Sequence, residues 1–209
     1  MHFSYSTINM LRTASHCWIN KMMKIQPEQY DYFTAGKEGH RIIQDHVAGI
    51  KKDPRLAFLT EVFPIVERRD FDPDCKFKME IRGYDFIGFY DGKDPAYKRF
   101  LEIKLSSSPW TLGKFKDAIQ RKIYALAEPT YTEAMLITGS LKPDEWIITK
   151  PKIMTVDLTK ADRDEAMQWI NEGIDIFENG DFNGGLDENG RCNLGRGCPW
   201  GDACHFKHI

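Results

Sequence analysis

Residues 83–124 read GYDFIGFYDGKDPAYKRFLEIKLSSSPWTLGKFKDAIQRKIY and combine strand patterns, a helix pattern and closely spaced charges. Because side chains alternate along a strand, Glu102 and Lys104 share one face and Ile103 points to the other. The preceding strand pattern ends in Asp91. Two carboxylates at one end of a sheet repel each other unless a cation lies between them. These residues therefore predict a Mg²⁺ or Mn²⁺ site, with Lys104 beside a metal-bound water that it helps to activate or orient.

Asp85 is an alternative carboxylate on the same strand. It lies six residues before Asp91, which is an even step, so both side chains point to the same face. Strand alternation alone therefore leaves the choice between the two open.

The helix pattern that follows predicts a surface for nucleic acid. Gln120 and Tyr124 lie four residues apart and share one helix face. Basic side chains surround them, and such side chains suit a phosphate backbone. The candidates for nucleic-acid contact in this stretch are Trp110, Lys114 and Arg121, with Lys116 and Lys122 nearby.

The order of patterns along the chain predicts an α/β domain with a mixed central β-sheet flanked by helices. Thr159 and Asp162 form a capping-box pattern at the start of the last helix. We expect helices at residues 6–23 (capped by Ser6), 34–51, 112–127 and 159–177, and strands at 75–81, 84–91, 100–105, 133–139 and 145–149, the last extended by 153–158. The first three strands are expected to form a meander.

Composition excludes membrane, collagenous and wholly disordered proteins. Of 209 residues, 42% are hydrophobic and 29% charged, which suits one globular domain with a buried core. The formal net charge is −2, so any nucleic-acid surface must be a local patch. The start of the chain has no apolar signal-peptide core, and no run approaches the ~18 apolar residues of a membrane span. We therefore expect a cytoplasmic protein that does not contact membranes.

Glycine and cysteine divide the chain. Seven of the 16 glycines lie between Gly180 and Gly201, which predicts a flexible linker. The cysteine count is odd, and three of the five lie within the last eighteen residues, a pattern typical of a cytosolic protein with a metal site at its end. The expected organisation is a main domain at 1–178, a Gly/Asn-rich linker at 179–190 and a small metal-binding tail at 191–209.

Several of these residues form motifs in a recognisable order. Gly88 to Asp91, Glu102 to Lys104 and Gln120 to Tyr124 resemble the GxxD, (D/E)xK and QxxxY motifs of RecB-type nucleases in the PD-(D/E)XK superfamily. Upstream, Gly36 to His40 resembles the GxxxH motif, and residues 3–18 resemble the Ser-rich opening helix. The resemblance extends over about residues 3–127, with all four motifs in the family's order.

This resemblance implies a restriction-endonuclease-like core and metal-dependent hydrolysis of DNA phosphodiesters. It implies His40, Asp91 and Glu102 as ligands, with the Ile103 carbonyl completing the metal shell, and it favours Asp91 over Asp85. Lys104 would be catalytic. Gln120 and Tyr124 would belong to the same site, and cleavage would leave 5′-phosphate and 3′-hydroxyl ends.

The tail has the spacing Cys192-x5-Cys198-x5-Cys204-x3-His208 and resembles CCCH zinc fingers. Four such ligands suit tetrahedral Zn²⁺, which can order a segment that has no core of its own. The resemblance implies nucleic-acid contact by the aromatic and basic residues between the ligands, and a purely structural clip is the alternative. These contact residues are Arg196, Trp200, Phe206 and Lys207.

An iron–sulfur cluster is the other interpretation of the cysteines. Some RecB-type nucleases hold such a cluster with one N-terminal and three C-terminal cysteines. Cys17 lies where the first would fall, with Cys192, Cys198 and Cys204 as the others, which leaves His208 unused.

The function expected from these patterns is a DNA exonuclease in recombination, repair or processing. Phage or mobile-element origin, action on single- or double-stranded ends and a recombination or replication partner are expected by analogy. An endonuclease of the same fold, a non-catalytic nucleic-acid-binding protein and an interaction subunit are the alternatives.

Overall fold

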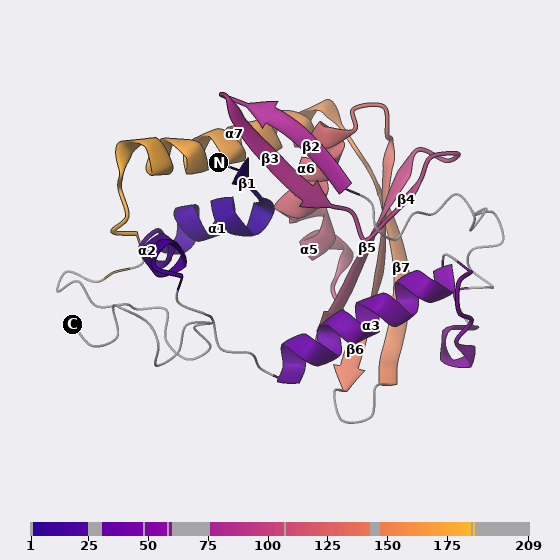
Figure 1. The fold of residues 1–209 in the computed structure, drawn as a ribbon. Coiled ribbons are helices and arrows are strands. Elements are labelled where there is room, and N and C mark those ends of the chain that lie inside the picture. The colour runs from indigo at the N-terminus through magenta and orange to yellow at the C-terminus, as the bar shows by residue number, and fades with distance from the viewer. Residues whose placement is uncertain are drawn as a thin grey trace. The chain divides into compact units, whose positions relative to one another are not determined.

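A computed structural model describes residues 2–24, 31–47, 49–57, 59, 76–106, 108–142, 147–184 and 186. These residues belong to two compact units. Figure 1 labels the helices and strands. The first lies within Met1–Tyr30, Glu80–Ile87 and Met167–Ile209, and the second within Asp31–Met79 and Gly88–Ala166. No helix among the described residues is both long and apolar enough to cross a membrane.

The first unit contains two short helices near its start, α1 (Tyr5–Ala14) and α2 (Cys17–Met22), where the sequence predicted one. The predicted cap at Ser6 is also wrong, because the Ser4 side chain accepts from the Thr7 N–H at 3.3 Å. The junction contacts a distant segment: the Ser15 hydroxyl accepts from the Gly184 N–H at 2.8 Å. Such a tertiary contact cannot be read from helix periodicity.

A small sheet of order β1-β3-β2 accompanies these helices. Its strands are β1 (His2–Phe3), β2 (Lys76–Ile81) and β3 (Tyr84–Phe89), with β1 parallel to β3. Positive φ angles of 55° and 79° at Arg82 and Gly83 suit the tight turn between β2 and β3. Phe177 of α7 (Lys160–Asn179) packs edge-on against Phe3 and closes this core.

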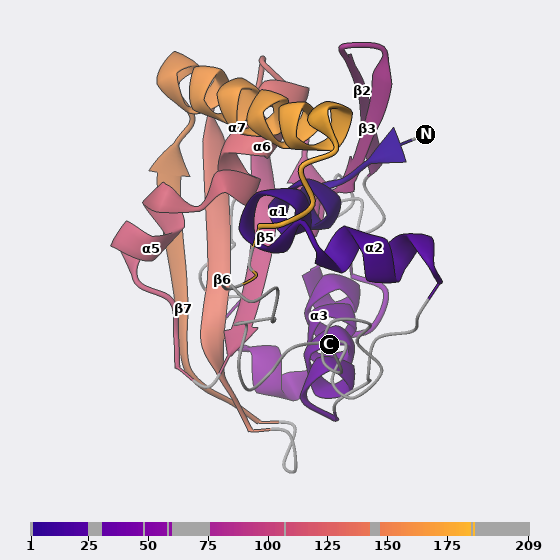
Figure 2. The same cartoon turned by 90° about the vertical axis from the view of Figure 1, so that its left-hand side faces the viewer.

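The second unit contains a mixed four-stranded sheet of order β4-β5-β6-β7, and Figure 2 shows β5, β6 and β7 running side by side. Its strands are β4 (Gly92–Asp94), β5 (Arg99–Ser106), β6 (Glu133–Lys142) and β7 (Ile147–Asp157). Strands β5 and β6 are parallel, and the other pairs are antiparallel. The mixed sheet is confirmed, but the three-strand meander is wrong: β3 pairs with β1 and β2, and β5 pairs with β4 and β6.

In the second unit, one helix has different ends from the predicted 34–51, and another predicted helix has the expected outer ends but is broken in two. Helix α3 spans Asp31–Val47, and two helices, α5 (Leu112–Asp117) and α6 (Ile119–Ala127), replace the single helix expected at 112–127. Ala118 between them has extended backbone, with ψ 115°. The Arg121 guanidinium donates to the Lys116 carbonyl at 2.7 Å, so the break does not leave that carbonyl without a partner.

The core of the second unit forms where α3 lies against the sheet (Figure 1). Its buried members come from α3, from the segment after it and from β5 and β6: Ile43, Val47, Leu56, Leu59, Leu101, Ile103, Met135 and Ile137. The predicted capping box is confirmed as well. Thr159 and Asp162 bond reciprocally, the Thr159 N–H to the Asp162 carboxylate at 2.8 Å and the Asp162 N–H to the Thr159 hydroxyl at 3.2 Å.

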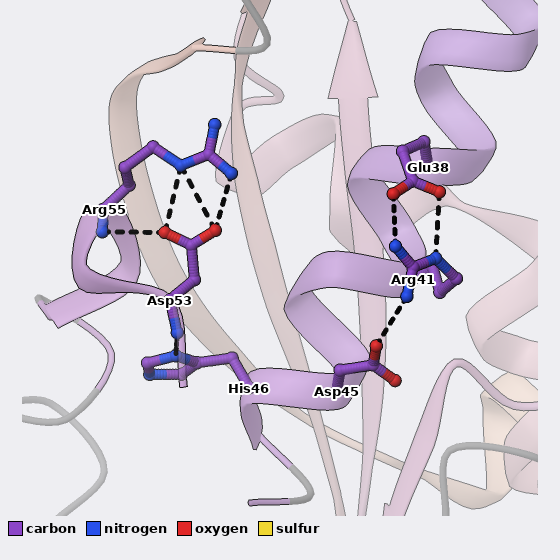
Figure 3. A network of polar contacts seen from close by, with 6 residues as sticks. All are labelled: Glu38, Arg41, Asp45, His46, Asp53 and Arg55. Carbon is purple, nitrogen blue, oxygen red and sulfur yellow. Dashed lines mark hydrogen bonds and ion pairs between the residues drawn. The ribbon is translucent and has the colours of Figure 1, made fainter. Parts of the chain in front are cut away.

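Charged side chains surround the C-terminal part of α3 (Figure 3). Arg41 pairs with Glu38 and Asp45 on the helix, and Asp53 pairs with Arg55 in the short 3₁₀ segment Pro54–Leu56. The Arg55 hydrogen bonds lower the pKa of Asp53 to about 2. Ionised Asp53 therefore stabilises the fold above its ordinary pKa of 3.8, and this contribution is lost as pH falls through about 2.

We predict that the Asp53→Asn variant is less stable than the parent by about 1 kcal/mol at neutral pH, because it loses the ion pair with Arg55. The loss is no larger because solvent screens part of that ion pair. Asn keeps an oxygen that can cap the Arg55 N–H, so the variant isolates the charge. The difference should shrink below pH 3.8 and vanish as pH falls below about 2. Urea unfolding followed by circular dichroism across this range measures it.

The control is Asp164→Asn, whose side chain is 63% exposed in its pair with Lys160 and should change stability by less than about 0.5 kcal/mol. A difference for Asp53→Asn that stays constant with pH would contradict the assignment of its effect to the Asp53 charge.

Candidate active site

The site is organised around Asp91, which follows β3 and precedes β4. Its carboxylate accepts a hydrogen bond from the Ile103 N–H of β5 at 2.7 Å. Strand β4 pairs with β5 only from Arg99 to Leu101, so the β5 edge at Ile103 lies beyond the β4 pairing. The Asp91 side chain takes the place of a strand neighbour there. This bond holds the carboxylate at the edge of the sheet, one residue from Glu102.

Helix α3 supports Asp91 from a second direction. The Gln44 side-chain amide donates to the Asp91 main-chain carbonyl at 2.7 Å. His40, one helical turn earlier on the same face, has its Nδ1 atom 3.7 Å from an Asp91 carboxylate oxygen. The structure thus brings the predicted residues His40 and Asp91 together, and it adds Gln44, which sequence reasoning missed. The i, i+4 spacing to His40 was the available signal for Gln44.

Glu102 and Lys104 lie side by side on β5, as strand alternation predicted. The Glu102 side chain is 3% exposed, and its carboxylate forms an ion pair with the Lys104 ammonium. Ile103 between them is fully buried in the core beneath α3. The strand therefore separates an apolar face from a charged one.

Gln120 and Tyr124 of α6 complete the group. The Gln120 carbonyl oxygen accepts from the Lys104 ammonium at 3.0 Å, and its amide donates to the Tyr124 hydroxyl at 2.6 Å. That hydroxyl donates in turn to the Phe89 carbonyl at 3.1 Å, and Tyr124 is buried. Gln120 is thus placed to orient Lys104, while Tyr124 ties α6 to the end of β3.

Burial dominates the electrostatics of the site. Desolvation, and next the negative charge of Asp91, raise the pKa of Glu102 to about 7, against the opposing effect of the Lys104 ammonium. Burial also raises the pKa of the Tyr124 hydroxyl well above its usual range. Tyr124 therefore stays protonated and remains a hydrogen-bond donor at neutral pH. Two carboxylates that lie near each other, one of them buried, repel each other when both are ionised, and a bound cation would offset that repulsion.

The donor types match a hard divalent cation. Two carboxylates, an imidazole and the Ile103 carbonyl are ligands that Mg²⁺ and Mn²⁺ accept. Within the described ranges, no three His, Cys, Asp or Glu side chains are arranged as a ready-made metal cluster. Glu102 is engaged by Lys104, and Asp91 by the Ile103 N–H. The donor types and the charges of these residues fit such an ion. In the structure, the Lys104 ammonium lies beside the Glu102 carboxylate.

Trp110 and Lys114 lie beside Lys104. The Lys104 ammonium is 5.6 Å from the centroid of the Trp110 ring, and the Lys114 ammonium is 4.5 Å from it. Lys114 is exposed on α5, and Trp110 is half-buried. An aromatic ring and an exposed ammonium thus lie next to the candidate catalytic lysine.

A phosphate contact requires an exposed side chain, and Arg121 is buried. Its side chain is 4% exposed and pairs with Asp162, with the closest hydrogen bond at 2.6 Å. Lys122 pairs similarly with Glu165 at 2.5 Å. Helix periodicity placed both residues on the helix but could not show that the start of α7 covers them. Arg121 therefore has no part in the nucleic-acid contact proposed below.

Two of the remaining predicted residues, Asp85 and Cys17, are described by the structure, and the residues of the tail are not. Asp85 lies in register with His2 of β1, in the first unit, whereas Asp91 contacts Ile103 of β5. Cys17 is buried, with its sulfur 3.4 Å from His16 Nε2. The zinc or iron–sulfur tail, its contact residues and the boundary at 191 lie outside the described residues: Cys192, Arg196, Cys198, Trp200, Cys204, Phe206, Lys207 and His208.

Comparison with known proteins finds likeness in structure alone. No protein-family model and no curated protein matches this chain. A solved structure from Eubacterium rectale, named as a "putative exonuclease", matches with a TM-score of 0.51 and 13% identity. That match covers 86% of this chain and 82% of the other.

Two further solved structures match with lower TM-scores. SSO0001 has a TM-score of 0.40 and 16% identity over 58% of this chain, which spans only 56% of that protein. The alkaline exonuclease LHK-Exo from Laribacter hongkongensis has a TM-score of 0.32 and 15% identity, covering 60% of this chain and 66% of that one. At these identities the likeness is one of fold, and this chain has a mixed α/β fold similar to that of the Eubacterium rectale protein.

Proposed function

We propose that this protein is a metal-dependent nuclease that hydrolyses phosphodiester bonds in DNA. The observation that carries the proposal is the convergence of Asp91, Glu102 and Lys104 beside the end of β4, with Gln120 bonded to the lysine. The fold similarity to a protein named as an exonuclease supports the same conclusion. It agrees with the four motifs that resemble RecB-type nucleases.

His40, Asp91, Glu102 and the Ile103 carbonyl would hold Mg²⁺ or Mn²⁺. Such an ion, when bound, supplies positive charge to the reacting phosphate and lowers the pKa of a water molecule. Lys104 would hold the attacking water or the phosphate by its ammonium, and Gln120 would fix the direction of that ammonium. Gln44 and the Ile103 N–H would keep Asp91 in place.

Trp110 and Lys114 would contact the DNA. Lys114 is exposed and can neutralise a phosphate, while an aromatic ring can stack on an unpaired base of any sequence. Neither contact reads sequence, so the proposed enzyme would cleave without a recognition site, and action at DNA ends is the form expected from the sequence. The zinc-finger-like tail, a recombination or replication partner and a phage or mobile-element origin remain predictions from the sequence.

A cleavage assay on matched linear and circular DNA, single- and double-stranded, in Mg²⁺ and in Mn²⁺, tests this function. Loss of linear DNA alone establishes an exonuclease, and cut circles establish an endonuclease. Tight binding with no cleavage in any arm would contradict the proposal and support a binding protein instead.

We predict that Lys104→Ala lowers the cleavage rate by about 10²–10⁴-fold while DNA affinity stays within about threefold. The variant should fold, because Glu102 can take up a proton when its cationic partner is removed. Single-turnover cleavage and fluorescence anisotropy measure the two quantities. Lys160→Ala, which removes an 82%-exposed lysine of the same charge, is the matched control. Cleavage by Lys104→Ala at the parent rate would exclude the assigned role.

We predict that Mn²⁺ binds about tenfold more weakly near pH 6 than near pH 8, because Glu102 must lose its proton to bind a cation. With no cation, the stability gained from neutral Glu102 is complete below its ordinary pKa of 4.5 and is lost as pH rises through about 7. Free Mn²⁺ measured by electron paramagnetic resonance gives the affinity.

Two variants separate Glu102 from the other titratable donor. Glu102→Gln should remove most of this pH dependence, and His40→Gln should retain most of it. Equal Mn²⁺ affinity of the parent protein at both pH values would show that Glu102 is not a ligand.

A further inference from the structure

The geometry points to Thr138 as a positioning residue that holds the Trp110 ring beside the Lys104 ammonium. This inference rests on the proposed nuclease function, because its consequence is for the placement of the catalytic lysine. Thr138 belongs to β6 and lies directly opposite Lys104 in the parallel pairing of β5 and β6.

The Thr138 hydroxyl joins two main-chain groups. It donates to the Lys104 carbonyl at 2.9 Å and accepts from the Trp110 N–H at 2.9 Å. Trp110 lies after β5 and just before α5. The bond from its main-chain N–H to Thr138 therefore holds this connecting segment against the sheet, next to Lys104. The indole and the ammonium come within 5.6 Å as a result.

Packing alone does not account for a hydroxyl at this position. Thr138 is fully buried and follows four buried apolar residues of β6, Ala134 to Ile137. A buried hydroxyl costs free energy unless it is hydrogen-bonded, and an apolar side chain of the same shape would fill this space without that cost. Thr138 uses its hydroxyl as donor and acceptor at once, and both partners lead to the candidate active site.

The arrangement matters most when Glu102 binds a cation. Its carboxylate would then hold the Lys104 ammonium less strongly, because the bound cation offsets its charge. Gln120 and the face of Trp110 would continue to hold the ammonium, through a hydrogen bond and a cation–π attraction. Thr138 keeps that aromatic face in position and cannot touch the substrate itself, since it is buried.

The test compares Thr138→Val, which keeps the shape and removes the hydroxyl, with Thr138→Ser, which keeps the hydroxyl. We expect Thr138→Val to lower kcat about tenfold, because the loss of the two hydrogen bonds weakens the placement of Lys104. KM should rise by a smaller factor, because the displaced Trp110 ring also contacts the DNA. Thr138→Ser should stay within about threefold of the parent. Thr155→Val, at an exposed threonine on β7, is the matched control.

A double-mutant cycle separates positioning from general loss of structure. Thr138→Val should add little to the loss already caused by Trp110→Leu, because both changes act on the same ring. Multiplied losses in the double variant, or an unchanged kcat in Thr138→Val, would overturn the inference. Circular dichroism of each variant checks that it is folded.

A spectroscopic readout needs no cleavage at all. In protein labelled with 5-fluorotryptophan, the Trp110 resonance is assigned from its absence in Trp110→Phe. We expect it to shift in Thr138→Val and in Lys104→Met, and to stay in place in Thr155→Val. If no DNA is cut, the nuclease proposal fails. The shift of the Trp110 resonance then still tests whether Thr138 holds Trp110 beside Lys104. An unmoved Trp110 resonance in Thr138→Val would overturn the positioning role.

Discussion

The hydrogen bond from the Ile103 N–H to the Asp91 carboxylate is the interaction on which the candidate site depends. It forms because β4 is short and stops pairing with β5 two residues earlier, which leaves the strand edge open to a side chain. The bond brings one carboxylate next to another that is buried on the same strand. Burial is the larger cause of the raised pKa of Glu102, and the charge of this neighbour is the second, so a main-chain feature of the sheet contributes to the charge balance of the site.

The groups around these carboxylates come from separate elements, and each is held by a bond of its own. Gln44 of α3 holds the Asp91 main chain, Gln120 of α6 holds the Lys104 ammonium, and Thr138 of β6 joins the Lys104 carbonyl to Trp110. A site assembled in this way is preorganised, because the scaffold rather than the substrate fixes its side chains. Preorganised charge is what hydrolysis of a phosphodiester requires.

Much of the fold could be predicted because its signals are local. Alternating side chains identified β2, β3, β5 and β6, and the Thr159–Asp162 capping box marked the start of α7. The wrong predictions about the sheets concern long-range pairing. The sequence between residues 92 and 98 reads as a loop, yet it contains β4, and β2 and β3 join a sheet with β1 instead of β5. Hydrophobic pattern identifies a strand but carries no information about its neighbour.

By itself, the sequence determined which residue types stand at which spacing, and therefore that Glu102 and Lys104 share a strand face and that Gln120 and Tyr124 share a helix face. The tertiary structure decided which of the basic residues are available. Arg121 and Lys122 lie in the same helix as Gln120, but their charges are neutralised by Asp162 and Glu165 at the start of α7. The tertiary structure also selected Gln44 and Thr138, whose roles follow from strand register and helix packing. Whether a polar group is exposed, paired or bonded depends on residues distant in the chain, and only the folded arrangement brings those together.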